Sequence, residues 1–311
     1  MGRPAFRIKQ AFSHHTSDLL GRLTRVSKLI VNVDDFGLTN GVNRAIFELH
    51  MAGVLTSTTL MAKAAASDDA IEIAKNTPTL GVGCHVVLVD GEPVLPAAQL
   101  PTLTDPRTGR FFPTLGAFLR GVATRRIYMN EVKAEATAQI SLLQARGVQL
   151  THIDTHKHTH MIPRVLCPVI HAAKACGIQR VRNPFEPAWS ANATANAPFM
   201  RRAQVSLLSK LFASRFHRFI AESGFTTTAG ALGVLATGTL DSATVRSIAA
   251  AIPAGNDAVY ELVTHPGYLD SDLERANTRL LASRETERNA LAALRDFSQL
   301  ELVSFAALEH D

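Results

Sequence analysis

Residues 29–37 of this chain, LIVNVDDFG, decide its fold class. The apolar, β-branched run over residues 29–33 is typical of a buried strand, and it stops sharply at two aspartates. Similar short apolar runs recur along the chain, and we expect strands at about residues 55–61, 81–88, 150–154, 179–182, 230–235, 258–264 and 300–305. Segments with a 3.6-residue apolar period separate them and predict helices at about residues 41–52, 67–77, 129–146, 164–176, 199–222, 241–252 and 283–297.

Strands that alternate with helices pair in parallel through crossover connections. We therefore predict an α/β fold, an irregular (β/α) TIM-like barrel of eight strands that forms one domain over residues 28–311. Residues 89–113 are rich in Pro, Gly and Asp and lie between a strand and a helix. A loop of that length inside a compact domain is usually functional, so we expect it to form a wall or lid of a site.

The composition excludes several classes of protein. The chain has 311 residues, of which 46% are hydrophobic and 19% charged, and this argues against disorder. No apolar stretch reaches the length of a membrane-spanning helix. The net charge is +5, but the basic residues are scattered, so we expect no nucleic-acid partner. The three cysteines form no CxxC pair, which favours a reducing, cytoplasmic location.

Residues 1–27 form a basic extension with five Arg and Lys residues against one Asp. It has no apolar signal region, and we expect it to be flexible. A frayed leader and a peripheral contact with an anionic membrane are both compatible with it.

Polar clusters follow several of the predicted strands. Asp34 and Asp35 end the first, His85 lies late in the third, the histidine-rich residues 152–160 end the fourth, and His265 ends the seventh. In a barrel the carboxyl ends of all strands open onto one face, so these side chains are expected to converge there. The five alternate polar residues of HIDTHKHTH would share one side of an extended segment, and they favour metal or acid–base chemistry.

Each cluster also has a structural interpretation. A lone His85 or His265 in an apolar strand is often a hydrogen-bonded core residue. The aspartates could cap the helix near residue 41, although Asn40 is better placed for that role. The spacing does not decide which histidines of residues 152–160 are ligands. One Asp with two His would form an open three-ligand metal site, beside which a second carboxylate can act as base and another histidine as acid.

The chain resembles the YdjC-like carbohydrate deacetylases over about residues 28–305. The matching motifs are VNVDDFGL at 31–38, GVLTSTT at 53–59, GCHV at 83–86, HIDTHKHTH at 152–160 and HPG at 265–267. Cys84, Val86 and Thr155 depart from the family pattern, which leaves the shape of the pocket in doubt rather than the chemistry. Residues 87–96 and 181–187 look more like the hopanoid-biosynthesis-associated group of that family.

The resemblance implies a distorted barrel that removes acetyl groups from an N-acetylated sugar or glycolipid, with a divalent metal. The implied metal ligands are Asp35, His85 and His156, with Asp34 as base and His265 as acid. Asp34 and Asp35 could exchange roles. The family favours Mg²⁺, and the two imidazoles would also suit Zn²⁺. A metal-dependent phosphoesterase, a non-catalytic sugar- or metal-binding barrel, and a homo-oligomeric state stay open.

Overall fold

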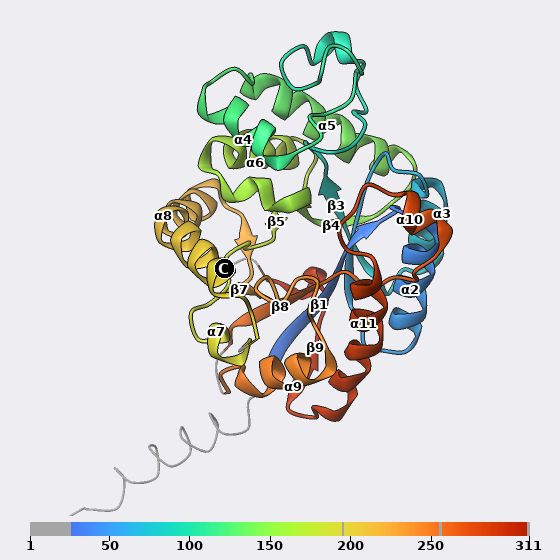
Figure 1. Ribbon diagram of the computed structural model, residues 1–311, viewed down its shortest axis with the longest axis vertical. Helices are drawn as coiled ribbons and strands as arrows, with labels where there is room; N and C mark the ends of the chain where they lie inside the picture. The colour runs from blue at the N-terminus through green and yellow to red at the C-terminus, as the bar shows by residue number, and fades with distance from the viewer. Residues whose placement is uncertain (1–25, 195, 255–256, 310–311) are drawn as a thin grey trace, which may run out of the picture.

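The computed structural model describes residues 26–194, 196–254 and 257–309 (Figure 1). The predicted basic extension lies almost entirely outside this range. The strands of the described chain are β1 (Ser27–Phe36), β2 (Ser57–Leu60), β3 (Gly81–Val86), β4 (Leu150–Thr155), β5 (Arg180–Val181), β6 (Thr226–Thr227), β7 (Gly230–Leu232), β8 (Val259–Thr264) and β9 (Leu300–Leu302). All the ladders between them are parallel, which confirms the predicted α/β barrel architecture.

Helices cover the outside of the sheet in Figure 1. The α-helices are α2 (Asn40–Met51), α3 (Ser67–Asn76), α4 (Leu115–Ala123), α5 (Met129–Ala145), α6 (Pro163–Ala175), α7 (Ser190–Ala193), α8 (Phe199–Ser223), α9 (Ser242–Ala251), α10 (Ser271–Arg275) and α11 (Ala282–Leu291). All seven predicted helices are confirmed, whereas α4, α7 and α10 were not predicted. The four residues of α7 and the five of α10 are too few for a clear period. Thr39 caps α2 by accepting from the Val42 N–H, so the expected cap at Asn40 is wrong by one residue.

All eight predicted strands are present in the described chain and β6 is an additional one, but they do not fill eight positions around the barrel. β8 pairs directly with β1 over residues 28–33, so no strand lies between them. β9, the expected eighth strand, instead pairs with residues 27–29 of β1 on its other edge, ahead of β2.

The seventh position of the ring is a broken strand. β6 pairs with β5, β7 pairs with β8, and only Thr228 and Ala229 separate β6 from β7. Two bonds strengthen this seam, as the Ala231 N–H donates to the Phe185 carbonyl over 3.1 Å and the Ala229 N–H to the Val259 carbonyl over 2.8 Å. The segment over residues 226–232 thus pairs with β5 through β6 and with β8 through β7.

Burial on both faces explains why the first five positions of the predicted β1 strand are almost all apolar. Leu29, Val31 and Val33 are buried in the main hydrophobic cluster, and Ile30 is buried against Phe305. A parallel strand covered on both faces needs apolar residues on both. None of the helices in the described ranges is long and apolar enough to cross a membrane.

Candidate active site

A cavity of about 660 Å³ opens at the carboxyl ends of the strands. All five residues predicted to carry the chemistry, Asp34, Asp35, His85, His156 and His265, line it. The long loop over residues 89–113 contributes Asp90 and Pro113 to its wall, as expected for a loop of that length. The convergence predicted from the strand ends is therefore present.

A backbone irregularity lets two adjacent aspartates face the same cavity. Consecutive strand residues point to opposite faces. The register between β1 and β2 shifts between Val33 and Phe36, and Asp35 has a φ of 65°, in the left-handed region. Such a bulge re-aims side chains at a sheet edge. The alternation is broken here, and both carboxylates turn toward the site.

Asp34 lies in a buried cluster built around one guanidinium. The Arg182 side chain holds both oxygens of Asp34, with Nη1–Oδ2 2.9 Å and Nη2–Oδ1 2.6 Å, and also forms ion pairs with Asp154 and Glu261. We call these four residues the arginine cluster. Burial opposes ionisation of Asp34, but the Arg182 charge outweighs it and holds the pKa of that carboxyl well below its ordinary value.

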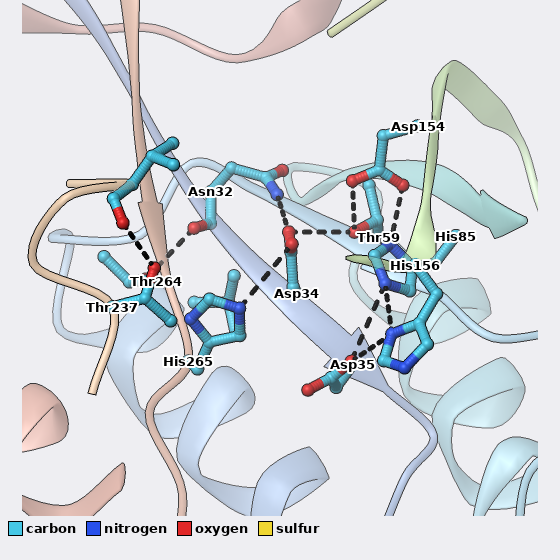
Figure 2. A network of polar contacts seen from close by, with 12 residues as sticks. Asn32, Asp34, Asp35, Thr59, His85, Asp154, His156, Thr237, Thr264 and His265 are labelled. Carbon is cyan, nitrogen blue, oxygen red and sulfur yellow. Dashed lines mark hydrogen bonds and ion pairs between the residues drawn. The ribbon is translucent and has the colours of Figure 1, made fainter. Parts of the chain in front are cut away.

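Asp35 lies in a second cluster, with His85 and His156, which we call the imidazole cluster (Figure 2). Asp35 Oδ1 is 3.6 Å from His85 Nε2 and 3.4 Å from His156 Nδ1, and the two nitrogens are 3.3 Å apart. Ligand atoms about 2.1 Å from a shared ion are separated by about 3.0–3.4 Å. The three donors therefore fit a divalent ion.

The surroundings of the imidazole cluster orient its donors. His85 Nδ1 is 2.7 Å from Asp154 Oδ1, which leaves Nε2 facing Asp35. A carboxylate behind a histidine is the usual support of a ligating imidazole. Thr59 adds a hydroxyl near Asp34, His85 and Asp154, at 3.1–3.3 Å. Burial disfavours the His85 cation, but Asp154 and the two nearby aspartates outweigh it and raise the pKa of His85 to about 9.

A buried cation also holds Asp35. Arg284 on α11 donates from Nη2 to Asp35 Oδ2 over 2.5 Å, so Oδ1 is the oxygen left facing the imidazoles. Burial would raise the pKa of Asp35, but Arg284 and then His156 keep it well below its ordinary value.

The alternative group of Asp34, His85 and Asp154 also gathers three donors within reach of one another. Both of its carboxylates are already paired with Arg182, however. The imidazole cluster is therefore the better candidate for a metal.

His265 approaches the cavity from the end of β8. Its Nε2 is 3.8 Å from Asp34 Oδ2, and its backbone N–H donates to Glu287 Oε2 over 2.6 Å. Glu287 also accepts from the Gly238 N–H over 3.2 Å, so this buried carboxylate ties the β8 end to the β7 side of the cavity. His265 Nδ1 is buried and has no hydrogen-bond partner among the described atoms.

The histidine-rich segment does not stay extended, so the expectation that its five polar residues share one side is wrong. β4 ends at Thr155, and residues 156–161 form a tight turn with Lys157 and His158 at positive φ. The turn brings His156 and His158 to the cavity, whereas His160 binds Thr155 and the Arg182 carbonyl beneath it.

His152 belongs to the core. Its ring stacks on Phe305 with centroids 3.7 Å apart, and a Cβ at Gly83 would lie 2.6 Å from that ring. Burial lowers the pKa of His152 to about 3, so the ring is neutral. This side chain follows the structural interpretation of a buried histidine.

Several buried charged residues of the site were not predicted from the sequence, namely Arg182, Glu261, Arg284 and Glu287. Arg182 directly follows β5, so the rule that strand ends converge could have found it. Glu261 lies within β8, and Arg284 and Glu287 lie on α11. No motif or strand end marks these three.

Polar contacts join three residues of the cavity wall, Asp90, Lys157 and Asn277. Asp90, after β3, accepts from Lys157 Nζ over 2.7 Å and also bonds Asn277 from the loop after α10. Asp90 itself has a φ of 61°. Three loops from separate parts of the sequence are thus joined through one carboxylate.

Comparison with known proteins identifies relatives over most of the chain. A family model described as YdjC-like protein matches residues 28–299. A carbohydrate deacetylase of Brevibacillus brevis is 33% identical over 90% of this chain and 99% of its own length. A carbohydrate deacetylase of Listeria monocytogenes is also 33% identical, over 90% of this chain and its full length.

A solved structure shares the fold. The crystal structure of an Enterococcus faecalis V583 protein described as a candidate cellobiose-phosphate cleavage protein matches with a TM-score of 0.67 and 23% identity. The match covers 90% of this chain and 98% of that one.

Proposed function

Because the chain belongs to the YdjC-like family, we propose that it is a metal-dependent deacetylase that hydrolyses the acetamide of an N-acetylated sugar. The products are acetate and a free amine. The observation that carries the proposal is the pairing of two sites in one cavity: three donor atoms at metal-ligand spacing, and beside them an ionised carboxylate and a histidine. The deacetylase names of the two bacterial relatives support the same reaction.

Asp35, His85 and His156 would hold the ion. When bound, a divalent ion polarises the acetamide carbonyl and makes water more acidic. Mg²⁺ is our first choice for the oxygen ligand of Asp35, and Zn²⁺ is the second because two of the three ligands are imidazoles.

Asp34 is the proposed base. Its carboxylate stays ionised because Arg182 lowers its pKa, and it takes the proton of the attacking water. His265, 3.8 Å from Asp34, gives a proton to the leaving nitrogen as the C–N bond breaks. Asp34 and Asp35 differ in the partners of their oxygens, since Arg182 covers both oxygens of Asp34 while Arg284 covers one of Asp35. This difference supports Asp35 rather than Asp34 as the ligand.

The finer substrate assignment is an N-acetylglucosaminyl lipid of the hopanoid type. Its support is the resemblance of residues 87–96 and 181–187 to that group of the family. Both segments lie at the site, as Asp90 lines the cavity and Arg182 holds Asp34. A cytoplasmic location, membrane-peripheral work and a homo-oligomeric state remain predictions.

The test measures acetate release by the purified, metal-stripped chain with Mg²⁺ or Zn²⁺ restored. The substrates are N-acetylglucosamine oligomers and an N-acetylglucosaminyl lipid. We expect release that depends on the added ion and falls by about 10²–10⁴-fold in Asp34→Asn. Release from the lipid alone would support the finer assignment. If no substrate yields acetate with either ion, but an aryl phosphate yields phosphate, the deacetylase proposal is overturned in favour of a phosphoesterase.

A further inference from the structure

Helix α8 leaves large apolar side chains in solvent. Of its 25 residues, only Phe216 and Ile220 are buried. Phe199 and Met200 are 80% and 76% exposed, and Leu207 and Leu211 are 56% and 52% exposed. These are four of the ten large hydrophobic side chains exposed in the described chain, so the exposure is concentrated on one element.

Three of these side chains share one face. Met200, Leu207 and Leu211 are spaced by seven and four residues, which places them above one another on a helix. Phe216 and Ile220 lie on the opposite side, where α8 packs on the barrel. The apolar stripe therefore points directly away from the protein.

Positive charge flanks the stripe. The helix carries five Arg and Lys residues, at 201, 202, 210, 215 and 218, against the single acidic residue Glu222. Lys210, Arg215 and Arg218 are exposed and lie three, four and seven residues from a stripe leucine. No ion pair joins these three to an acidic side chain within the part of the chain that the structure describes.

The first turn of this helix also forms part of the active-site wall. Arg201 lines the cavity and donates from Nη1 to the Thr237 carbonyl over 2.9 Å. Figure 1 shows α8 at the left margin of the molecule, outside the sheet. A flat partner that covers the outward face of α8 would thus reach the edge of the cavity.

We propose that the outward face of α8, formed by Met200, Leu207, Leu211, Lys210, Arg215 and Arg218, docks on an anionic lipid surface. A helix with an apolar stripe and flanking basic residues lies in the plane of a bilayer interface, with its cations near the lipid headgroups. The charge decides between lipid and a second copy of the chain. A two-fold contact would bring the same basic residues face to face, and this like-charge arrangement costs affinity.

Docking would bring the cavity to its substrate. This consequence rests on the proposed function with a lipid-linked sugar, whereas the docking itself does not. A headgroup that rises from the bilayer could enter beside Arg201 while its lipid stays in the membrane.

The experiment measures sedimentation of the full chain with vesicles. One set is phosphatidylcholine alone, and the other is two parts phosphatidylcholine to one part phosphatidylglycerol. We expect binding to the anionic set that weakens as salt is raised. The double variant Leu207→Gln/Leu211→Gln should lower the partition coefficient at least about tenfold. Lys210→Gln/Arg215→Gln/Arg218→Gln should lower it by about 100-fold at low salt, or about fivefold per charge.

The matched control is Met51→Gln/Tyr128→Gln, which removes two exposed apolar side chains from α2 and the start of α5. It should bind vesicles as the parent chain does. All variants keep residues 1–27, so the basic N-terminal segment is the same in every arm. Circular dichroism and acetate release from a soluble substrate check that the α8 variants are folded.

Three outcomes would overturn the proposal. These are no binding to anionic vesicles, equal binding by the α8 variants and the parent, and a dimer that Leu207→Gln/Leu211→Gln dissociates while no vesicles are bound. Vesicle binding through α8 without acetate release would leave the docking surface intact and reject the deacetylase instead.

Discussion

The arginine cluster and the imidazole cluster share one cavity, but they differ in what balances the negative charge of their buried carboxylates. In the arginine cluster the chain supplies the cation, since Arg182 contacts Asp34, Asp154 and Glu261. In the imidazole cluster three donor atoms face one another at 3.3–3.6 Å, and Arg284 covers only the far oxygen of Asp35. The first cluster is held by a cation of the chain itself, whereas the second has a donor set that fits an added ion. Adjacent residues, Asp34 and Asp35, thus belong to different chemical sites.

The strongest test of this contrast removes the internal cation. In Arg182→Met, three buried carboxylates lose their partner, and we expect the free energy of unfolding to fall by about 3–5 kcal/mol. Urea unfolding followed by circular dichroism measures it. Arg107→Met, which breaks an exposed pair with Asp105, should cost less than about 1 kcal/mol. A loss in Arg182→Met as small as in this control would mean that the arginine cluster does not support the fold.

The second test removes a donor from the imidazole cluster. His156→Ala should lower acetate release by about 10³-fold or more, because the ion loses one of three ligands. Its free energy of unfolding without metal should stay near that of the parent, since His156 is not part of the main core. His171→Ala, an exposed histidine on α6, is the matched control. Full activity in His156→Ala would reject the assigned ligand set.

Asp154 touches both clusters and should have an intermediate effect. In Asp154→Asn, His85 loses its carboxylate partner, and we expect the affinity for the ion to fall by about 10–100-fold. Isothermal titration calorimetry with Mg²⁺ or Zn²⁺ gives the value. Asp68→Asn, an exposed aspartate on α3, should leave the affinity unchanged. An unchanged affinity in Asp154→Asn would show that the arginine cluster does not influence ion binding at the imidazole cluster.

The last prediction concerns the pH dependence of stability and changes a slope rather than removing an interaction. Burial, which outweighs the attraction of Arg182, raises the pKa of Glu261 to about 7 from its ordinary 4.5. Between pH 4.5 and 7, Glu261 therefore keeps its proton in the folded state and has lost it in the unfolded state. The resulting stability is present below pH 4.5 and lost as pH rises through 7.

Glu261→Gln should therefore flatten the fall of unfolding free energy between pH 5 and 7 by up to about 1.4 kcal/mol per pH unit. Urea unfolding at several pH values compares the variant with the parent. Parallel pH curves for the two chains would show that Glu261 does not titrate in this range.

The sequence predicted the helices and the meeting of the strand ends well, because both depend on local periodicity and on one topological rule. It could not predict the missing eighth position. Residues 300–302 have the composition of a strand, but only tertiary pairing decides which edge of β1 they join. The shared side expected for the histidine segment failed for a similar reason, since the turn at Lys157 and His158 depends on positive φ at non-glycine residues.

The candidate site was predictable where chemistry followed strands. Asp34, Asp35, His85 and His265 all lie at or near strand ends, and the structure gathers them in one cavity. Arg284 and Glu287 could not be predicted, because they reach the site from a helix whose charges look like those of any solvated face. Buried cations on helices leave no signal in one sequence.

The broken seventh strand has a consequence for where the barrel opens locally. Short ladders open more readily than long ones, and here only two residues pair with β5 and three with β8, whereas six residues of β1 pair with β8. Amide protons along this seam should exchange with deuterium before those of β1. The seam adjoins the cavity wall at Val234 and Thr237, so its opening would enlarge the entrance beside α8 and leave the ion-binding donors on β1, β3 and the β4 end in place.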